Sequence, residues 1–411
     1  MRIGIFTDTY PPFINGVSTS IKMLENALRK QGHKVYIVTV NPKDMKYVYE
    51  DNGRIIRIPG IPIGIYDYRL TTAYPIRAVN KIKKWKLDVI HTHTEFGIGT
   101  FARVIGKQFN IPVVHTYHTM YEDYVHYITK GFFDGPSKKI VEYLTKFYCD
   151  KTTKELIVPT KKTYDLFKEK YKYDRNVHII PTGIEIERFY KENLNQEQKN
   201  KIKQDLGLKI DNIVILFLGR IGSEKNVEFL INNHKELLKE NKKVKLLIIG
   251  DGPDLETYKE LCNELKIQDS VIFTGKVPWD RVPLYYGIAD IFATASHTET
   301  QGLTVIEAMA SSLPVVSLDD DAFRTVVIED LNGYLFKDKD EYISKISKLI
   351  NDKNLRVKLG NQARINSETY SSKYFAERVL DVYKLTKKRK RKNKTFLDKI
   401  KSILDKIGYA K

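Results

Sequence analysis

Short apolar segments alternate with longer amphipathic segments along this chain, and that alternation constrains the fold more than any other feature. In the first half, apolar runs of strand length occupy residues 3–7, 35–40, 89–92, 112–116 and 155–159. Residues 17–30, between the first two runs, have the spacing of an amphipathic helix. Strands that alternate with helices imply a parallel sheet covered on both faces.

The second half of the chain repeats this plan. Its apolar runs occupy residues 213–218, 244–249, 271–274, 291–293 and 314–317. Segments of helical spacing lie between them at residues 227–239, 253–265 and 303–310. A chain of 411 residues is also too long for one ordinary core. We therefore predict an α/β protein of two doubly wound, Rossmann-like domains facing each other across a cleft, with ligands outside the carboxyl ends of the strands.

The predicted domain limits follow from changes in composition. The polar stretch at residues 191–203 is the expected linker or domain-start helix. The predicted segments are residues 1–194 for the first domain, 195–368 for the second, 369–386 for a C-terminal helix that crosses back to the first domain, and 387–411 for a basic tail.

The chain carries a strong excess of positive charge. Its 69 lysines and arginines outnumber 51 acidic residues, which gives a formal net charge of +18. Such an excess favours a polyanionic partner, namely nucleic acid, an anionic membrane or an acidic substrate. The two cysteines, Cys149 and Cys262, have no neighbours typical of a metal or redox site, so we expect a reducing cytosol. Since no leader precedes the first strand and no apolar stretch approaches the ~20 residues that span a bilayer, any membrane contact is expected to be peripheral.

Two glutamates bracket a predicted helix start in the second half. Glu299 follows the apolar run at residues 291–293, and Glu307 lies inside the helical segment 303–310. Gly302 stands between them, where the N-terminus of the helix would direct free N–H groups at an anion. The pair could therefore accept hydrogen bonds from the two ends of a sugar-nucleotide. Two solvated surface carboxylates would give the same spacing.

Two other loops also follow predicted strands. Arg220 and Lys225 flank a glycine-containing loop after residues 213–218, where two cations could neutralise a leaving diphosphate. Gly16 precedes the helix at 17–30 and would let a phosphate or sugar approach the main chain. A solvated basic loop and an ordinary strand-to-helix turn are the alternative interpretations.

Four histidines, His91, His93, His115 and His118, follow two further predicted strands. No carboxylate or cysteine completes a ligand set at the usual spacing, so we predict no metal site. His118 is better suited to a hydrogen bond with a sugar hydroxyl or to steadying developing charge. His91 and His93 could equally be packed near the strand ends.

Several of these motifs occur in the order typical of the retaining glycosyltransferases of family 4, which have the GT-B architecture. The sequence resembles that family from Gly4 to the expected helix near residues 374–383. The motifs that carry the resemblance are Asn15-Gly16-Val17, His118, Gly219-Arg220 with Lys225, Gly250-Asp251-Gly252-Pro253, and the pair Glu299 and Glu307. Within the family, residues 118–127 are most similar to the bacterial 1,2-diacylglycerol 3-glucosyltransferases.

The resemblance implies a role for each motif. The implied catalytic residues are His118, Glu299, Arg220 and Lys225. The implied donor-binding residues are Gly16, Arg220, Lys225, Glu299, Gly302, Leu303 and Glu307. The two cations would hold the donor diphosphate, with Glu299 on the hexose and Glu307 on the ribose. His118 would lie near the transferred sugar, on the acceptor side.

The resemblance also implies a reaction. Glucose would move from UDP-glucose to the 3-hydroxyl of 1,2-diacylglycerol with retention of configuration, which makes α-monoglucosyldiacylglycerol. The first domain would face the acceptor and the membrane, and the second would bind the nucleotide-sugar. No metal or covalent cofactor is implied, and Mg²⁺ is expected at most to stimulate the reaction. The implied place is the cytoplasmic side of the cell membrane, with diacylglycerol in an anionic bilayer as the partner.

Two basic regions are candidates for the membrane contact. In the first, aromatic residues interleave with cations, and Pro75 could begin a helix with one apolar side. Its predicted membrane-binding residues are Arg69, Arg77, Lys81, Lys83, Lys84 and Trp85. The tail combines a cationic run with helical apolar spacing, and residues 384–411 hold more than half of the excess charge. Its predicted membrane-binding residues are Lys388, Arg389, Lys390, Arg391, Phe396, Ile400 and Ile403. A helix packed on its own domain, and a tail that docks on a partner, are the alternatives.

Other functions remain open at this point. The same fold and UDP-sugar donor could serve a phosphatidylinositol, a glycolipid or a cytosolic glycan, and glucose is not separated from galactose. Charge alone also suggests a nucleic-acid-binding protein. Because the charge concentrates in the tail and no DNA or RNA module is recognisable, we predict no nucleic-acid partner. A noncatalytic scaffold is disfavoured by the joint presence of Arg220, Lys225, Glu299 and Glu307.

Overall fold

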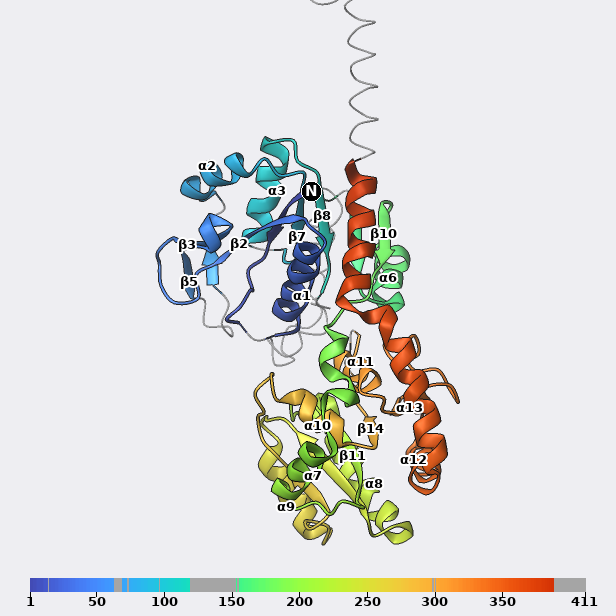
Figure 1. The fold of residues 1–411 in the computed structure, drawn as a ribbon. Helices are drawn as coiled ribbons and strands as arrows, with labels where there is room; N and C mark the ends of the chain where they lie inside the picture. Colours follow the sequence, from blue (N-terminus) through green and yellow to red (C-terminus); the bar gives the residue numbers. More distant parts are fainter. Residues whose placement is uncertain are drawn as a thin grey trace, which may run out of the picture. The chain divides into compact units, whose positions relative to one another are not determined.

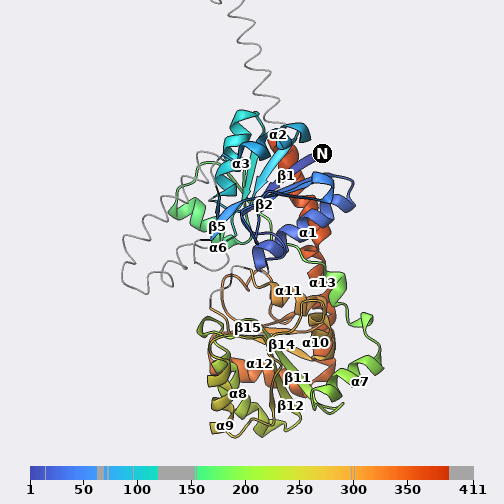
Figure 2. The same cartoon turned by 90° about the vertical axis from the view of Figure 1, so that its left-hand side faces the viewer.

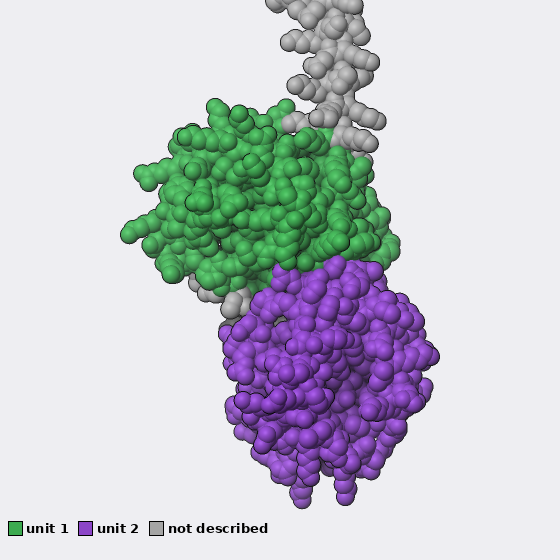
Figure 3. Space-filling model, in the orientation of Figure 1, with its two compact units in different colours: residues 1–183, 372–411 green, residues 184–371 purple. Residues whose placement is uncertain are grey.

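A computed structural model describes residues 1–13, 15–62, 69–71, 74–95, 97–118, 153, 155–297, 299 and 301–387. The chain forms two compact units (Figure 3). Unit 1 comprises Met1–Gly183 and Ser372–Lys411, and unit 2 comprises Ile184–Ser371. Figures 1 and 2 show the strands and helices of each unit from two directions.

The units divide ahead of the predicted boundary at residues 194 and 195. Ile184, Ile186 and Phe189 are buried in the apolar core of unit 2. The Ser311 hydroxyl also donates a hydrogen bond to the Phe189 carbonyl at 2.7 Å. The boundary prediction was therefore late, because it followed the polar composition of residues 191–203 and overlooked the apolar residues just before them.

Unit 1 is built on an eight-stranded sheet in the order β10-β9-β8-β7-β1-β2-β4-β3. Neighbouring strands run parallel except for β3, which is antiparallel to β4. The strands are β1 (Arg2–Phe6), β2 (Lys34–Val40), β3 (Val48–Glu50), β4 (Ile55–Ile58), β7 (Val89–Thr92), β8 (Val113–Thr116), β9 (Glu155–Val158) and β10 (Asn176–Ile179). A separate antiparallel pair joins β5 (Gly60–Pro62) to β6 (Arg69–Thr71).

Helices cover both faces of this sheet because adjacent strand residues point to opposite sides. Ile37 of β2 packs in one core with α1 and the C-terminal helix, and its neighbour Val38 packs in the other core with α2 and α3. The helices are α1 (Gly16–Lys30), α2 (Ile76–Trp85), α3 (Ile98–Gln108), α6 (Lys161–Asp165), which continues as the π-helical turn η2 (Leu166–Lys170), and residues 372–387. A short 3₁₀ turn, η1, spans Asp51–Gly53.

The C-terminal helix belongs to unit 1, as the sequence predicts, although it begins at residue 372 and not 369. Phe375, Val379 and Tyr383 recur at the spacing of one helix face. They are buried in the same core as Ile3 and Ile5 of β1. The last helix therefore packs on one face of the unit 1 sheet.

Unit 2 contains a six-stranded parallel sheet in the order β13-β12-β11-β14-β15-β16. The strands are β11 (Ile213–Leu218), β12 (Val244–Ile249), β13 (Val271–Phe273), β14 (Ile291–Thr294), β15 (Val315–Leu318) and β16 (Gly333–Phe336). The α-helices are α7 (Gln196–Asp205), α8 (Val227–Glu240), α9 (Leu255–Glu264), α10 (Val282–Ile288), α11 (Leu303–Ala310), α12 (Lys339–Asn351) and α13 (Lys353–Ser367). The 3₁₀ turns are η3 (Ile186–Phe189), η4 (Lys191–Asn193), η5 (Ser223–Lys225) and η6 (Glu368–Tyr370).

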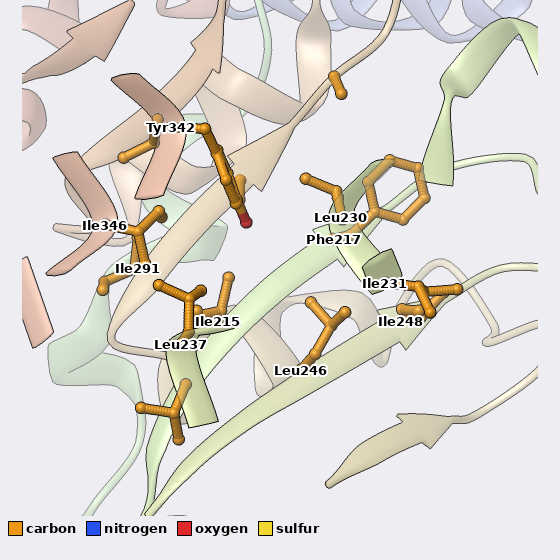
Figure 4. Packing of buried hydrophobic residues seen from close by; sticks show 14 of the residues in the cluster. Ile215, Phe217, Leu230, Ile231, Leu237, Leu246, Ile248, Ile291, Tyr342 and Ile346 are labelled. Atoms are coloured by element: carbon orange, nitrogen blue, oxygen red, sulfur yellow. The ribbon is translucent and has the colours of Figure 1, made fainter. Parts of the chain in front are cut away.

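Each face of the second sheet has its own apolar core. On one face, Ile215 and Phe217 of β11 pack with side chains of α8 and with Tyr342 and Ile346 of α12 (Figure 4). On the other face, the alternate β11 residue Leu216 packs with residues of α10 and α11. Because these strands are buried, polar side chains are expected at their carboxyl ends and in the loops that follow.

Candidate active site

Two loops at the carboxyl edge of the unit 2 sheet bring Lys225 and Glu299 together. The loop after β11 contains η5, which carries Lys225, and the loop after β14 carries Glu299. Because β11 and β14 are parallel neighbours, both loops leave the same edge of the sheet. The Lys225 ammonium forms an ion pair with Oε1 of Glu299, and the Ser296 hydroxyl donates to the same oxygen at 3.1 Å. Two residues predicted from separate motifs are thus direct neighbours.

The Lys225–Glu299 pair is accessible from solvent. The side chains of Lys225 and Glu299 are 20% and 21% exposed, so water can reach both charged groups. The Lys225 ammonium also lies 3.5 Å from the Ser296 hydroxyl. An ammonium and a carboxylate at one accessible edge can take a phosphate on one side and sugar hydroxyls on the other.

Arg220 lies in the same loop but outside this pair. Its side chain is 61% exposed, and its Nη1 is 3.4 Å from Oε1 of Glu224. An ion pair this long and this exposed holds the guanidinium only weakly. The group is therefore free to turn toward an anion at this edge.

Gly302 is the N-cap residue of α11 and has a backbone conformation that favours glycine. Gly302 has φ of 70°, and a Cβ at this position would lie 2.6 Å from a ring carbon of Phe323. The N-cap glycine has no side chain that could cap the helix, and the first turn contains no acidic residue. The N-terminus at Leu303 therefore presents a positive dipole end to an anion.

Glu307 occupies different surroundings from Glu299. The Tyr286 hydroxyl lies 2.9 Å from its Oε2 and 3.1 Å from the Thr304 carbonyl oxygen. Burial raises the pKa of Glu307 to about 7, while the Tyr286 hydrogen bond and the charge of Arg188 act in the opposite direction. The carboxyl can consequently change its protonation near neutral pH. The second glutamate predicted from the sequence is a distinct site with its own electrostatics.

Four residues of unit 2 that contact or lie near these groups were not predicted from the sequence: Arg188 of η3, Tyr286 of α10, Trp279 and Ser296. The Arg188 guanidinium carbon lies 3.3 Å from the centre of the Trp279 ring, which forms a flat, 47% exposed surface. Trp279 is one of two tryptophans in the chain and follows a strand, so its position could have flagged it. Arg188 and Tyr286 carry no such signal, because their relation to Glu307 exists only in the folded chain.

In unit 1, His118 comes two residues after β8 and contacts another histidine. Nδ1 of His93 lies 2.8 Å from Nε2 of His118. Burial, and then the neighbouring His115, lower the pKa of His118 to about 4, while Glu95 acts in the opposite direction. His118 is therefore neutral at ordinary pH and can form hydrogen bonds without carrying charge.

Gly16 is the first residue of α1 and is exposed. The Asn15 side chain accepts a hydrogen bond from the Ser18 N–H at 2.9 Å and so caps the helix. A Cβ at Gly16 would meet no protein atom within 4 Å. Nothing in the described part of the chain demands glycine here, so its surroundings have room for another molecule.

The four histidines do not form a metal site in the part of the chain that the structure describes. His115 lies 3.1 Å from Oε1 of Glu95 and 2.7 Å from the Thr92 hydroxyl. His91 lies 2.7 Å from the Thr116 hydroxyl. Within the described residues, no three histidine, cysteine or carboxylate side chains are placed to hold a metal ion. The independence from metals stays a prediction.

The structure corrects the prediction that Trp85 inserts into a membrane. Trp85 is only 6% exposed, and its ring stacks on Tyr36 with centroids 4.8 Å apart. The apolar side of α2, with Ala78, Val79 and Ile82, packs in the same core. The alternative interpretation of this segment, a helix packed on its own domain, is the one the structure adopts.

The cations of this region are still largely exposed. Arg77, Lys83 and Lys84 lie on the outer side of α2, and Lys81 is half-buried. Arg69, on β6, donates to the Gly60 carbonyl at 3.0 Å. The predicted tail residues Lys388, Arg389, Lys390, Arg391, Phe396, Ile400 and Ile403 lie outside the described residues. Among the helices that are described, none has the length and apolar character needed to cross a membrane.

Two family models match most of the chain between them. The model of the glycosyl transferases group 1 matches residues 198–366, and that of glycosyltransferase family 4 matches residues 14–188. An alpha-monoglucosyldiacylglycerol synthase of Streptococcus pneumoniae is 39% identical over 386 residues, which cover 93% of this chain and 85% of that protein. The enzyme of the same name from Acholeplasma laidlawii is 37% identical over 389 residues, or 93% and 96% of the two chains.

Solved structures share the fold at low sequence identity. Sucrose-phosphate synthase from Thermosynechococcus elongatus superposes with a TM-score of 0.70 at 19% identity, covering 93% of this chain and 98% of that one. Anabaena HepE, crystallised with UDP and glucose, gives a TM-score of 0.67 at 16% identity, covering 92% and 98%. The predicted pair of Rossmann-like domains is confirmed, and the chain belongs to the family 4 glycosyltransferases with the GT-B fold.

Proposed function

We propose that this glycosyltransferase moves glucose from UDP-glucose to the 3-hydroxyl of 1,2-diacylglycerol and makes α-monoglucosyldiacylglycerol with retention of configuration. The observation that carries the proposal is 37–39% identity over 93% of the chain to two enzymes named alpha-monoglucosyldiacylglycerol synthase. That identity runs through both units, and so includes the unit expected to meet the acceptor as well as the one expected to meet the donor.

The carboxyl edge of the unit 2 sheet supports a sugar-diphosphate donor. The Lys225 ammonium, the exposed Arg220 guanidinium and the uncapped N-terminus of α11 supply positive charge at this edge. In the free protein the Lys225 ammonium is paired with Glu299. On donor binding the ammonium would turn to the diphosphate, and Glu299 would accept hydrogen bonds from the hexose hydroxyls. The pair thus keeps each group oriented until the donor arrives.

The reaction needs charge stabilisation more than a strong base. The bond from the anomeric carbon to the diphosphate oxygen breaks, and a bond to the acceptor hydroxyl oxygen forms on the same face. The hydroxyl proton passes to a phosphate oxygen of the departing UDP. Lys225 and Arg220 would stabilise the charge that develops on the diphosphate, which is where a preorganised cation contributes most. His118, which is neutral, would orient a hydroxyl by a hydrogen bond.

A transfer assay tests the proposal directly. Purified protein is mixed with UDP-glucose and with vesicles that contain diacylglycerol, with and without anionic lipid, and the lipid products are separated. We expect a monoglucosyl lipid whose anomeric proton coupling identifies the α-linkage. Hydrolysis of UDP-glucose without a lipid product would reject diacylglycerol and direct the search to phosphatidylinositol, glycolipid or glycan acceptors. UDP-galactose in a parallel reaction decides which hexose is used.

We also propose that the protein is a peripheral membrane protein that binds the cytoplasmic face of an anionic membrane. The acceptor is a lipid, and unit 1 has exposed apolar residues, namely Met45, Ile61, and Ile76 at the start of α2. The Arg77 guanidinium over the Tyr47 ring, at 5.8 Å, connects α2 to the segment that carries Met45. Cations beside exposed apolar side chains suit the headgroup region of a bilayer.

Vesicle sedimentation separates the two basic regions. Replacement of Lys388, Arg389, Lys390 and Arg391 by glutamine should weaken binding to anionic vesicles and leave UDP-glucose binding unchanged, because each cation near an anionic surface contributes about 1 kcal/mol. Replacement of Arg77, Lys83 and Lys84 by glutamine makes the matched change on the described helix. If neither set lowers vesicle binding, both regions are excluded as the membrane contact.

A further inference from the structure

Three histidine rings of unit 1 form a row, here called the histidine row: His91, His93 and His118. The centroids of the His91 and His93 rings are 4.1 Å apart, and those of His93 and His118 are 5.1 Å apart with planes at 22°. His91 belongs to β7, His93 follows that strand directly, and His118 comes two residues after the neighbouring β8. The row therefore lies at the carboxyl edge of the sheet. The proposed function uses only its last member, His118.

The inner end of the histidine row is held by hydrogen bonds. Nδ1 of His91 lies 2.7 Å from the Tyr383 hydroxyl, and Nε2 lies 2.7 Å from the Thr116 hydroxyl. Tyr383 is a fully buried residue of the C-terminal helix. With both ring nitrogens engaged, His91 cannot rotate, and it gives the His93 ring a fixed surface to pack against.

All three rings are neutral. Burial first, and then the neighbouring histidines, hold the pKa of His91 and of His93 well below the usual range. A neutral imidazole has one N–H and one bare nitrogen, so one of the two rings must donate its N–H in the contact between His93 and His118. The identity of the donor ring decides whether Nδ1 of His118 is an N–H donor or a bare acceptor toward a ligand.

The burial of His93 favours one of the two arrangements. His93 is 2% exposed, and its Nε2 has no hydrogen-bond partner within the described residues. If His118 donated the hydrogen, His93 would carry its own hydrogen on this Nε2 and bury an unsatisfied N–H. Buried N–H groups without an acceptor are rarer in proteins than buried acceptors without a donor. His93 is therefore the donor, through Nδ1.

We propose that His93 is a positioning residue for His118: its Nδ1–H donates to Nε2 of His118, which places the hydrogen of His118 on Nδ1 and presents that N–H to a hydroxyl oxygen of the bound sugar or acceptor. His118 would then act as a neutral hydrogen-bond donor and not as a base. The role of His118 in this inference rests on the proposed function. The tautomer itself is a property of the free protein.

The experiment compares two substitutions of His93 that differ in one hydrogen bond. His93→Asn places an amide N–H near the position of Nδ1 and can still donate. His93→Phe keeps a ring on His91 but removes the donor. Long-range ¹H–¹⁵N NMR correlations of ¹⁵N-histidine-labelled protein then identify which nitrogen of His118 carries hydrogen in each variant.

We expect the Nδ1–H tautomer of His118 in the wild type and in His93→Asn, and a mixture of tautomers in His93→Phe. In the glucosyl transfer assay, kcat should fall by about tenfold in His93→Phe, as for other residues that orient a functional imidazole, and recover in His93→Asn. KM for UDP-glucose should not change. An unchanged His118 tautomer in His93→Phe would overturn the proposal. Equal loss of kcat in both variants would also overturn it, because that pattern indicates a purely structural role.

Two further variants act as controls. His234→Phe makes the same change at a buried histidine of unit 2, and it should leave the His118 tautomer unchanged. Tyr383→Phe removes only the hydroxyl that holds His91 and should shift the His118 tautomer less than His93→Phe does. If the tautomer shifts as expected but wild-type protein transfers no glucose, the proposed function fails and the positioning inference stands.

Discussion

The carboxyl edges of the two sheets share a topology and differ in charge. At the edge of unit 2, Lys225 and Glu299 form an accessible ion pair beside the start of α11. At the edge of unit 1, the histidine row is neutral, and its inner members His91 and His93 are buried. An accessible pair of charges can exchange partners with an anionic ligand, whereas buried neutral rings can only donate or accept single hydrogen bonds.

This difference shows that parallel sheets fix where a ligand binds but leave its chemistry to the loops. Water reaches Lys225 and Glu299, which pair with each other until a ligand intervenes. The histidines lose their charge first through burial, and the neighbouring histidines lower their pKa values further. The charged edge suits a diphosphate, and the neutral edge suits hydroxyl groups.

Removal of the cation at the charged edge should have the largest effect. Lys225→Met retains the length of the side chain but cannot neutralise a leaving diphosphate. We expect kcat/KM for UDP-glucose to fall by about 10²–10³-fold, as when one preorganised group that stabilises transition-state charge is lost. Steady-state kinetics measures this fall. Lys242→Met, at an exposed lysine between α8 and β12, is the matched control and should retain full activity. Equal activity in the two variants would remove Lys225 from the reaction.

Loss of the carboxylate should have the next largest effect. Glu299→Ala removes the hydrogen bonds expected to hold the hexose, and a hydrogen bond to a charged group contributes about 1.5–3 kcal/mol. We therefore expect kcat/KM to fall roughly 10- to 100-fold while circular dichroism shows a folded protein. Because Lys225 and Glu299 are direct partners, the double variant should lose less than the product of the two single effects. Strictly multiplicative losses would mean that the two residues act independently.

The architecture of the chain could be predicted from hydrophobic periodicity, because buried parallel strands are short, apolar and regularly spaced. The predicted runs at 213–218 and 244–249 coincide with β11 and β12, and the predicted helix at 303–310 coincides with α11. The strands β3, β4, β5, β6, β10 and β16 were missed, since runs of only three or four residues carry little pattern to be recognised. The helices α3, α6 and α10 were not predicted, and α12 and α13 were absent because the predicted segments of the second domain stopped at the run 314–317.

The candidate site could be predicted only as a list of residues. Charge and loop position identified Lys225 and Glu299, but their pairing depends on which strands are neighbours. The raised pKa of Glu307 was invisible, because it arises from burial of the carboxyl beside Tyr286 of another helix. Trp85 was misjudged for a related reason. An aromatic residue among lysines looks like a membrane contact until the partner ring of Tyr36 is known.

The two glycines that start α1 and α11 should respond differently to the same substitution. Gly302→Ala forces alanine to φ of 70° and places its Cβ against Phe323. We expect this change to lower the free energy of unfolding by about 1–2 kcal/mol, the usual cost of the left-handed conformation. Gly16→Ala should change that free energy by less than about 0.5 kcal/mol, because no protein atom surrounds the new Cβ.

Chemical denaturation measures both glycine variants, and enzyme kinetics then adds a second contrast. If the donor phosphates approach the backbone at Gly16 closely, Gly16→Ala should raise KM for UDP-glucose although the protein is as stable as the wild type. An unchanged KM would remove Gly16 from the donor site without affecting the stability comparison.

The smallest expected effect is a pH dependence of opposite sign in the two units. Burial raises the pKa of Glu307 from 4.5 to about 7, so the folded state holds a proton that the unfolded state releases. Its contribution to stability is present at low pH and is lost as the pH rises from 4.5 through 7. His118 behaves in the opposite way. Its pKa falls from 6.5 to about 4, so its contribution is present above pH 6.5 and is lost as the pH falls through this window.

Glu307→Gln isolates the contribution of Glu307 to the pH dependence of stability. The difference in unfolding free energy between the wild type and Glu307→Gln should decline as the pH is raised from 4.5 to 7, because only the wild type loses the bound proton. Urea unfolding followed by the fluorescence of Trp279, in a Trp85→Phe background for both proteins, restricts the measurement to unit 2. The decline should be modest, since Glu307 is only partly buried and solvent screens its charge. A difference that rises with pH would show that Glu307 is stabilised as the anion, and the contrast between its carboxyl and the ion-paired carboxylate of Glu299 would then disappear.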